Sequence, residues 1–144
     1  MGRSAMSSDG RVSIEATRAV VEEYLASERR AETAALAPDV VFRFMATGDE
    51  HRGPEAVRAM LRYFYREAFE ARTERRRLVV GEGTAVFEGV FVGRHTGEFA
   101  GVPATGRDVR VPLAVVYDVD DGAIVEARLY FELPAFLTQV TTTA

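Results

Sequence analysis

The stretch Gly106–Leu133 constrains the fold more than any other part of the chain, because it contains two strand-like runs joined by a tight turn. Apolar residues recur at every second position across Val109–Val119, which is the period of a half-buried strand. The turn residues Asp120–Gly122 follow, and a second strand-like run begins at Ile124. We therefore expect a β-hairpin around which the rest of the chain is organised.

The return strand of this hairpin has two different faces. Its odd positions from 125 to 131 are apolar, and its even positions are polar or aromatic. Successive side chains of a strand point to opposite sides, so Glu126, Arg128, Tyr130 and Glu132 share one face. This polar row is either a solvated sheet surface or the lining of a site.

Length and composition narrow the class of protein. At 144 residues and 47% hydrophobic, the chain fits one globular domain. We expect residues 1–11 to be a disordered leader or a remnant of expression, and residues 12–144 to be a single domain. The formal net charge of -4 argues against nucleic acid and membrane partners. No apolar stretch approaches the roughly 18 residues of a membrane span, and we expect a cytoplasmic protein.

The residue types that are missing restrict the chemistry further. The chain has no cysteine and no lysine, and its five serines all lie near the N-terminus. Thiol, Schiff-base and serine hydrolase chemistry are therefore not expected. The two histidines, His51 and His95, do not have metal-binding spacing, so we expect neither a metal nor an organic cofactor. Proton transfer is left to carboxylates, tyrosines or one of these histidines.

Periodicity and turn signals predict the remaining elements. We expect helices over residues 13–29 and 53–69, and short helical pieces over 31–36 and 135–140. We expect strands over residues 39–45, 72–80 and 83–95 in addition to the hairpin. This order implies an α+β fold in which helices pack on one face of an antiparallel sheet. Strong curvature of the sheet would leave a cavity under those helices.

The predicted strand over residues 83–95 is apolar on both faces. Ala85, Phe87 and Phe91 lie on one face, and Val86, Val90 and Val92 lie on the other. Such a strand must be covered on both sides, and one set of helices covers only one of them. We therefore expect a homodimer that buries the second face. Gly89 and Gly93, on the aromatic face, mark either bulges or room for a ligand.

Three segments of the chain together resemble a known family. These are the run GRHTGEFAGVPATGR at residues 93–107, DGAIVE at 121–126 and YFE at 130–132. They resemble the SnoaL-like polyketide cyclases of the nuclear transport factor 2-like superfamily, over roughly residues 13–140. The resemblance implies a cone-shaped barrel in which a curved antiparallel sheet carries helices on its concave face. It also implies homodimers and an apolar, polyketide-like substrate.

The resemblance also suggests site residues. Cyclases of this family carry an aspartate acid/base at the position of Glu132, and many have a histidine at the position of Asp118. We expect Glu132, His95 and Asp118 to be catalytic. Each has a plain structural alternative, which is an exposed strand-end carboxylate, a strand-end histidine or a turn-flanking acid. The expected substrate-binding residues are Tyr130, Arg128, Tyr24, Phe44, Phe91 and His51.

The expected function is that of a cofactor-independent cyclase or isomerase that closes a ring by acid/base or shape-driven catalysis. Two alternatives stay open, because the superfamily hosts several activities. An epoxide hydrolase of the limonene epoxide hydrolase type would need Asp118, Arg128 and Glu132 to face one pocket. A non-catalytic ligand-binding or dimerisation module would need no acid.

Overall fold

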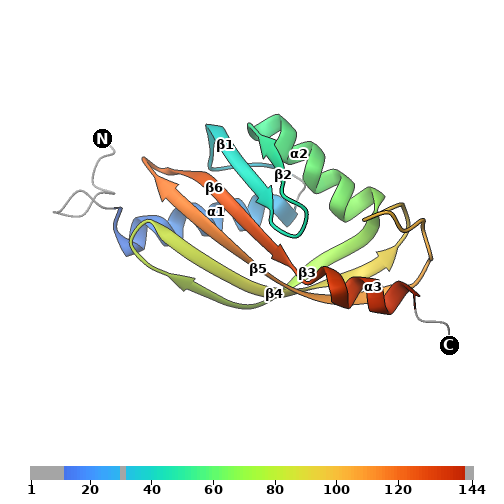
Figure 1. The fold of residues 1–144 in the computed structure, drawn as a ribbon. Coiled ribbons are helices and arrows are strands. Elements are labelled where there is room, and N and C mark those ends of the chain that lie inside the picture. Colours follow the sequence, from blue (N-terminus) through green and yellow to red (C-terminus); the bar gives the residue numbers. More distant parts are fainter. Residues whose placement is uncertain (1–11, 30–31, 142–144) are drawn as a thin grey trace.

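The computed structural model describes residues 12–29 and 32–141, so the predicted leader, residues 1–11, lies outside the described residues. Six strands form one curved sheet, and helices pack against it (Figure 1). The elements in chain order are α1 (Ile14–Arg29), β1 (Leu36–Phe44), β2 (Asp49–Arg52), α2 (Pro54–Arg62), the π-helical turn η2 (Tyr63–Glu67), β3 (Phe69–Val80), β4 (Thr84–His95), β5 (Asp108–Asp120), β6 (Ala123–Phe131) and α3 (Leu133–Thr141).

The sheet is open and mostly antiparallel, which confirms the predicted α+β class. Its strand order is β2-β1-β6-β5-β4-β3. Sequential strands from β3 to β6 pair as antiparallel neighbours, and β1 pairs with β6 in parallel. The long strands β3, β4 and β5 curve together, and α1 lies across one end of the curve (Figure 1).

The predicted central hairpin is formed by β5 and β6. Asp121 and Gly122 both have positive φ, at 51° and 79°, as a two-residue turn of primed type requires. Leu113 pairs with Phe131, and Phe131 is buried as the phase of the strand predicts. The odd positions of β5 and the apolar positions of β6 therefore face the helices.

Helix α1 begins where the sequence predicts. The Ser13 hydroxyl accepts a hydrogen bond from the Ala16 amide at 3.1 Å, as an N-cap does. Val21 and Tyr24 are fully buried by packing on β3 to β6. The Thr17 hydroxyl accepts a hydrogen bond from the Gly83 amide at 2.9 Å, which ties α1 to the turn between β3 and β4.

The predicted helix over residues 53–69 is found as α2 followed by η2. Pro54 stands in the first turn, where its missing amide hydrogen costs nothing. The Ala68 amide donates a hydrogen bond of 2.7 Å to the carbonyl of Tyr63, five residues earlier. This spacing is the π-helical pattern. The wider turn places Phe64 in the core, at 4% exposure.

Gly89 allows β3 and β4 to approach each other closely on the concave side. A β-carbon at Gly89 would lie 2.6 Å from the Glu74 carbonyl oxygen and 2.7 Å from the Phe87 ring. The register of the two strands shifts between Arg75 and Arg77, directly beside Gly89. The glycine therefore accompanies a bulge, and the space it leaves is occupied by the protein itself.

Aromatic rings fill the part of the concave face that lies nearest α3. Phe64 stacks on Phe91 with 4.5 Å between ring centroids, and Phe69 contacts Phe91 edge-on at 4.9 Å. Further rings of this aromatic cluster come from Phe44, Phe99, Phe131 and Phe136. On the opposite, outer face of the sheet, Val86, Val90, Val92 and Val116 stay half-exposed.

The short helix predicted over residues 31–36 was wrong in its described part, and two features of the sheet were not predicted. Residues 32–36 form no helix: Ala35 has a φ of 63°, and β1 begins at Leu36. The strand β2 was not predicted, because Asp49–Arg52 is short and polar. The parallel pairing of β1 with β6 was not predicted either, because it joins segments far apart in the chain.

Candidate active site

A cavity of about 440 Å³ opens between α1, the α2–η2 segment and strands β3 and β4. This size is typical of pockets for small organic molecules, which span about 300–1,000 Å³. A narrow recess continues inward toward β5 and β6, and both share Leu25, Glu28 and Tyr65 as walls. The cavity is lined by Leu25, Glu28, Arg58, Leu61, Arg62, Tyr65, Arg66, Ala71, Arg72, Thr73, Arg75 and Phe87.

Glu28 is the carboxylate in this lining, and it is half-buried. It lies one helical turn after Tyr24 on α1, and the Tyr24 hydroxyl donates a hydrogen bond to Glu28 Oε2 at 2.8 Å. The inner walls around this pair are apolar and come from Phe42, Phe87, Leu113, Val115 and Leu129. A carboxylate in such surroundings is equipped for proton transfer.

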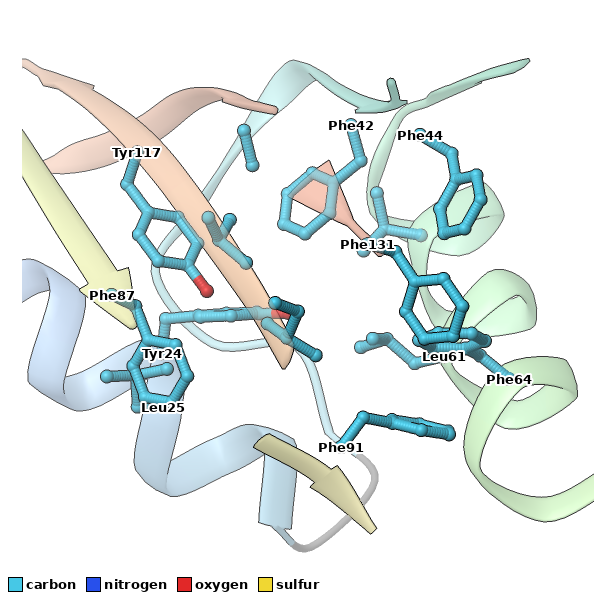
Figure 2. Close-up of a cluster of buried hydrophobic side chains, with 14 of the residues drawn as sticks. Tyr24, Leu25, Phe42, Phe44, Leu61, Phe64, Phe87, Phe91, Tyr117 and Phe131 are labelled. Atoms are coloured by element: carbon cyan, nitrogen blue, oxygen red, sulfur yellow. The ribbon is translucent and has the colours of Figure 1, made fainter. Parts of the chain in front are cut away.

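Two further phenols approach Glu28 from the sheet and from η2. The Tyr117 ring lies 5.7 Å from the Tyr24 ring, and the hydroxyl oxygens of both point into the buried cluster (Figure 2). The Tyr65 hydroxyl shares a 2.6 Å hydrogen bond with the Thr73 hydroxyl. Three phenols and one carboxylate thus meet at the inner end of the cavity.

The electrostatics of this group keep the phenols protonated. Burial raises the pKa of Tyr24, Tyr65 and Tyr117, and the nearby negative charge of Glu28 raises it further in each case. Phenols whose pKa is raised remain hydrogen-bond donors at neutral pH. The inner end of the cavity therefore combines a proton acceptor with several donors.

Glu132 lies outside this cavity. It is exposed at the junction of β6 and α3, where its backbone carbonyl accepts a hydrogen bond from the Ala135 amide at 3.0 Å. Its carboxylate makes no hydrogen bond or ion pair with any residue in the described ranges. Its catalytic role remains a prediction, and the structure places it away from the hollow under the helices.

The polar row of β6 lies on the outer face of the sheet. Arg128 donates hydrogen bonds to Asp118 at 2.8 Å and to Glu126 at 2.7 Å. The pKa of Arg128 is raised, mainly by the hydrogen bond to Asp118. Tyr130 is 46% exposed. Asp118, Arg128 and Tyr130 therefore do not line the cavity.

His95 is fully buried at the end of β4, beside the aromatic cluster. Its Nδ1 accepts a hydrogen bond from the Thr105 amide at 3.3 Å and lies 2.9 Å from the Thr105 hydroxyl. Its Nε2 is buried and has no partner among the described residues. Burial lowers the pKa of His95, which favours the neutral imidazole. Phe69 and Phe136 pack against the ring, and His95 does not line the cavity.

The remaining expected residues are scattered. Phe44 and Phe91 belong to the aromatic cluster and not to the cavity wall. His51 lies on the edge strand β2, opposite Phe42. Of the nine predicted residues, Tyr24 alone reaches the site, through its hydrogen bond to Glu28.

Comparison with known proteins identifies the family. A model of the SnoaL-like polyketide cyclases matches residues 14–140. The chain belongs to the SnoaL-like polyketide cyclase family. No match to a protein of curated function was found.

Solved structures show the same fold. A SnoaL-like protein from Jannaschia sp. CCS1 is 20% identical over 90% of this chain and 94% of its own, with a TM-score of 0.77. TsrD from Streptomyces laurentii is 24% identical over 90% and 97%, with a TM-score of 0.74. A nuclear transport factor 2-like protein from Burkholderia xenovorans LB400 is 19% identical over 90% and 98%, with a TM-score of 0.72. Identities this low establish that the fold is shared. They do not indicate whether the substrate is shared.

Glu28, the carboxylate that lines the cavity of this SnoaL-like protein, left a faint signal in the sequence. Val21, Tyr24, Leu25 and Glu28 follow helical spacing, so Glu28 continues an apolar stripe that faces the core. A carboxylate on such a stripe is a candidate for a buried role. Within residues 12–29 and 32–141, no group of three potential metal ligands is present, and no helix is long and apolar enough to span a membrane.

Proposed function

We propose that this SnoaL-like protein is a cofactor-independent cyclase or isomerase that closes a ring in an apolar, polyketide-like substrate inside the cavity. The observation that carries the proposal is the half-buried Glu28 carboxylate, hydrogen-bonded to a buried phenol within apolar walls. The family membership supports the substrate class.

The proposed reaction is a ring closure of the aldol type. The Glu28 carboxylate removes a proton from the carbon next to a substrate carbonyl, and the resulting enolate carbon forms a bond to a second carbonyl carbon of the same chain. Tyr65 and Tyr117 donate hydrogen bonds to the oxygen that carries the developing charge. The protonated Glu28 carboxyl then gives its proton to the new alkoxide, and Tyr24 holds the carboxyl in place through their hydrogen bond. One proton moves from carbon to oxygen, and no oxidant or reductant is needed.

The shape of the cavity contributes to the rate. The main cavity is walled on its apolar side by Leu25, Leu61 and Phe87, against which an apolar chain can be held in a folded conformation. Holding two reacting carbons in contact removes entropy that the free chain must lose before it reacts.

The test is ring closure of an aryl 1,5-diketone to its cyclic β-hydroxy ketone. After the reaction is stopped, acid removes water from this product, and the resulting conjugated cyclohexenone is measured by its ultraviolet absorbance. Glu28→Gln keeps the size of the side chain but removes its proton-transferring carboxylate, and we expect a rate loss of about 10² to 10⁴-fold. Glu23→Gln is the matched control, because Glu23 lies on the same helix, is exposed and does not line the cavity. We expect it to react at the parent rate.

Glu132→Gln is the decisive comparison. A large loss in Glu132→Gln with an unchanged Glu28→Gln would refute the role of Glu28 and support the family position. A parent protein that binds the diketone but does not close its ring would support the ligand-binding module. The epoxide hydrolase alternative is not favoured, because Asp118 and Arg128 pair on the outer face while Glu132 lies beyond the end of β6.

A further inference from the structure

The outer part of the cavity is strongly basic, although the whole chain has a net charge of -4. Arg58, Arg62 and Arg66 line it from α2 and η2, and Arg72 and Arg75 line it from β3. Glu28 is the acidic side chain in the same lining. Such an arrangement is not expected of a pocket that receives an uncharged substrate.

Three of these arginines form ion pairs with neighbouring glutamates of the protein. Arg75 holds the Glu22 carboxylate in a two-pronged contact of 2.6 and 3.1 Å. Arg72 approaches Glu74 at 2.9 Å, and Arg58 approaches Glu55 at 3.3 Å. Their positive charge is therefore largely compensated by the protein.

Arg62 and Arg66 differ from the other three. Neither guanidinium group forms a hydrogen bond or an ion pair with any residue in the part of the chain that the structure describes. They lie four residues apart, next to the cavity residues Leu61 and Tyr65. Like charges at this spacing repel each other, so the pair does not stabilise the helix. Ten guanidinium N–H donors at the edge of an apolar cavity remain available to a ligand.

We infer that the substrate carries an oxyanion, a carboxylate or a phosphate, that Arg62 and Arg66 bind at the entrance while its apolar part occupies the cavity. This inference rests on the proposed function and specifies the substrate class. Guanidinium groups bind planar or tetrahedral oxyanions through paired hydrogen bonds. The cavity volume of about 440 Å³ accommodates the apolar part, and the exposed side chains of Arg62 and Arg66 are placed to bind the charged end.

An anchored anion would also orient the substrate. Leu61 and Tyr65 each stand one residue before one of the two arginines, and both also line the inner recess with Glu28. A substrate held by its charged end at Arg62 and Arg66 extends its chain inward along this wall toward the Glu28 carboxylate. The anion thereby selects which carbon reaches the base, as remote binding groups do in catalysis.

The test uses two fluorescent dyes that differ by one charged group. The anionic dye is 8-anilinonaphthalene-1-sulfonate, and the neutral dye is N-phenyl-1-naphthylamine. We expect the parent to bind the anionic dye about tenfold more tightly, and this preference to shrink as salt is raised. The double variant Arg62→Gln/Arg66→Gln should lose about tenfold in affinity for the anionic dye and nothing for the neutral dye.

The control variant is Arg76→Gln/Arg77→Gln, which removes two exposed arginines of β3 that do not line the cavity. It should bind both dyes as the parent does. An equal loss in both double variants would show general electrostatic attraction and overturn the inference. Equal binding of the two dyes by the parent would also overturn it, and would leave the proposed function standing. If neither dye binds, the cavity is not an apolar ligand site, and the proposed function fails as well.

Displacement of the anionic dye separates the two sources of the oxyanion. We expect 2-naphthoate or 2-naphthyl phosphate to displace it, and the methyl ester of 2-naphthoic acid to be weaker by about tenfold. Stronger displacement by 2-naphthoate identifies a carboxylate, and stronger displacement by 2-naphthyl phosphate identifies a phosphate. Equal displacement by the neutral ester overturns the inference.

Discussion

Replacement of Gly89 by alanine tests whether the curvature of the sheet depends on the close approach of β3 and β4. The added β-carbon would lie 2.6 Å from the Glu74 carbonyl oxygen, which is about 0.8 Å closer than the 3.4 Å at which ordinary contact begins. It would also lie 2.7 Å from the Phe87 ring. The carbonyl belongs to the backbone of the neighbouring strand, so it moves only if the two strands separate.

The expected cost follows from two opposing effects. Overpacking of this kind costs about 1–3 kcal/mol. Alanine at a position with ordinary φ recovers about 0.4–1 kcal/mol, because it restricts the unfolded chain. We therefore expect Gly89→Ala to lower the free energy of unfolding by about 1–2 kcal/mol. For a chain of this length that corresponds to a fall in Tm of roughly 2–8 °C.

Urea denaturation of the parent and two variants measures this cost. Gly81→Ala is the control, because its β-carbon would meet nothing closer than the Thr84 carbonyl at 3.6 Å. It should be neutral or slightly stabilising. A Gly89→Ala protein as stable as the parent would refute the claim that this glycine is required for the curvature. Because Phe87 lines the cavity, binding of the neutral dye should weaken in Gly89→Ala and not in Gly81→Ala.

Two further predictions concern His95 and the outer face of the sheet. Burial lowers the pKa of His95, so the unfolded chain binds more protons as the pH falls below the ordinary histidine value of about 6.5, and stability is lost from there downward. His95→Leu should flatten the dependence of unfolding free energy on pH between about 7 and 5, and an unchanged slope would contradict this. We also predict a homodimer through the half-exposed valines of the outer face, so light scattering should give twice 15.9 kDa for the parent and a monomer for Val90→Glu. A monomeric parent would exclude this interface.

The fold was largely predictable because its main signals are local. Alternation over β4, β5 and β6 and the turn at Asp121 and Gly122 depend on neighbouring residues alone. The strand β2 has no such signal, since Asp49–Arg52 is entirely polar and pairs at the edge of the sheet. The pairing of β1 with β6 depends on the whole topology, which periodicity within a segment does not contain.

The candidate site was much less predictable than the fold, as the polar row of β6 shows. The phase of β6 correctly predicted that Glu126, Arg128 and Tyr130 lie opposite the apolar residues of the strand. The helices pack on the apolar face, so a polar row on the other face cannot line a cavity beneath them. Glu28 was not among the predicted residues, because its neighbours in the candidate site come from β3, β5 and η2, and only folding brings these segments together.

The π-helical turn at Tyr63–Glu67 has a consequence for the range of molecules that fit. Phe64 in this turn separates the hollow part of the concave face from the part filled with rings, because it lines the recess and also stacks on Phe91. A π-helical turn corresponds to one residue inserted into an α-helix, and removing one residue would rotate everything after it by about 100°. The boundary of the cavity therefore depends on a single residue of this helix, and a chain without it would place a different side chain between the hollow and the ring-filled parts of the concave face.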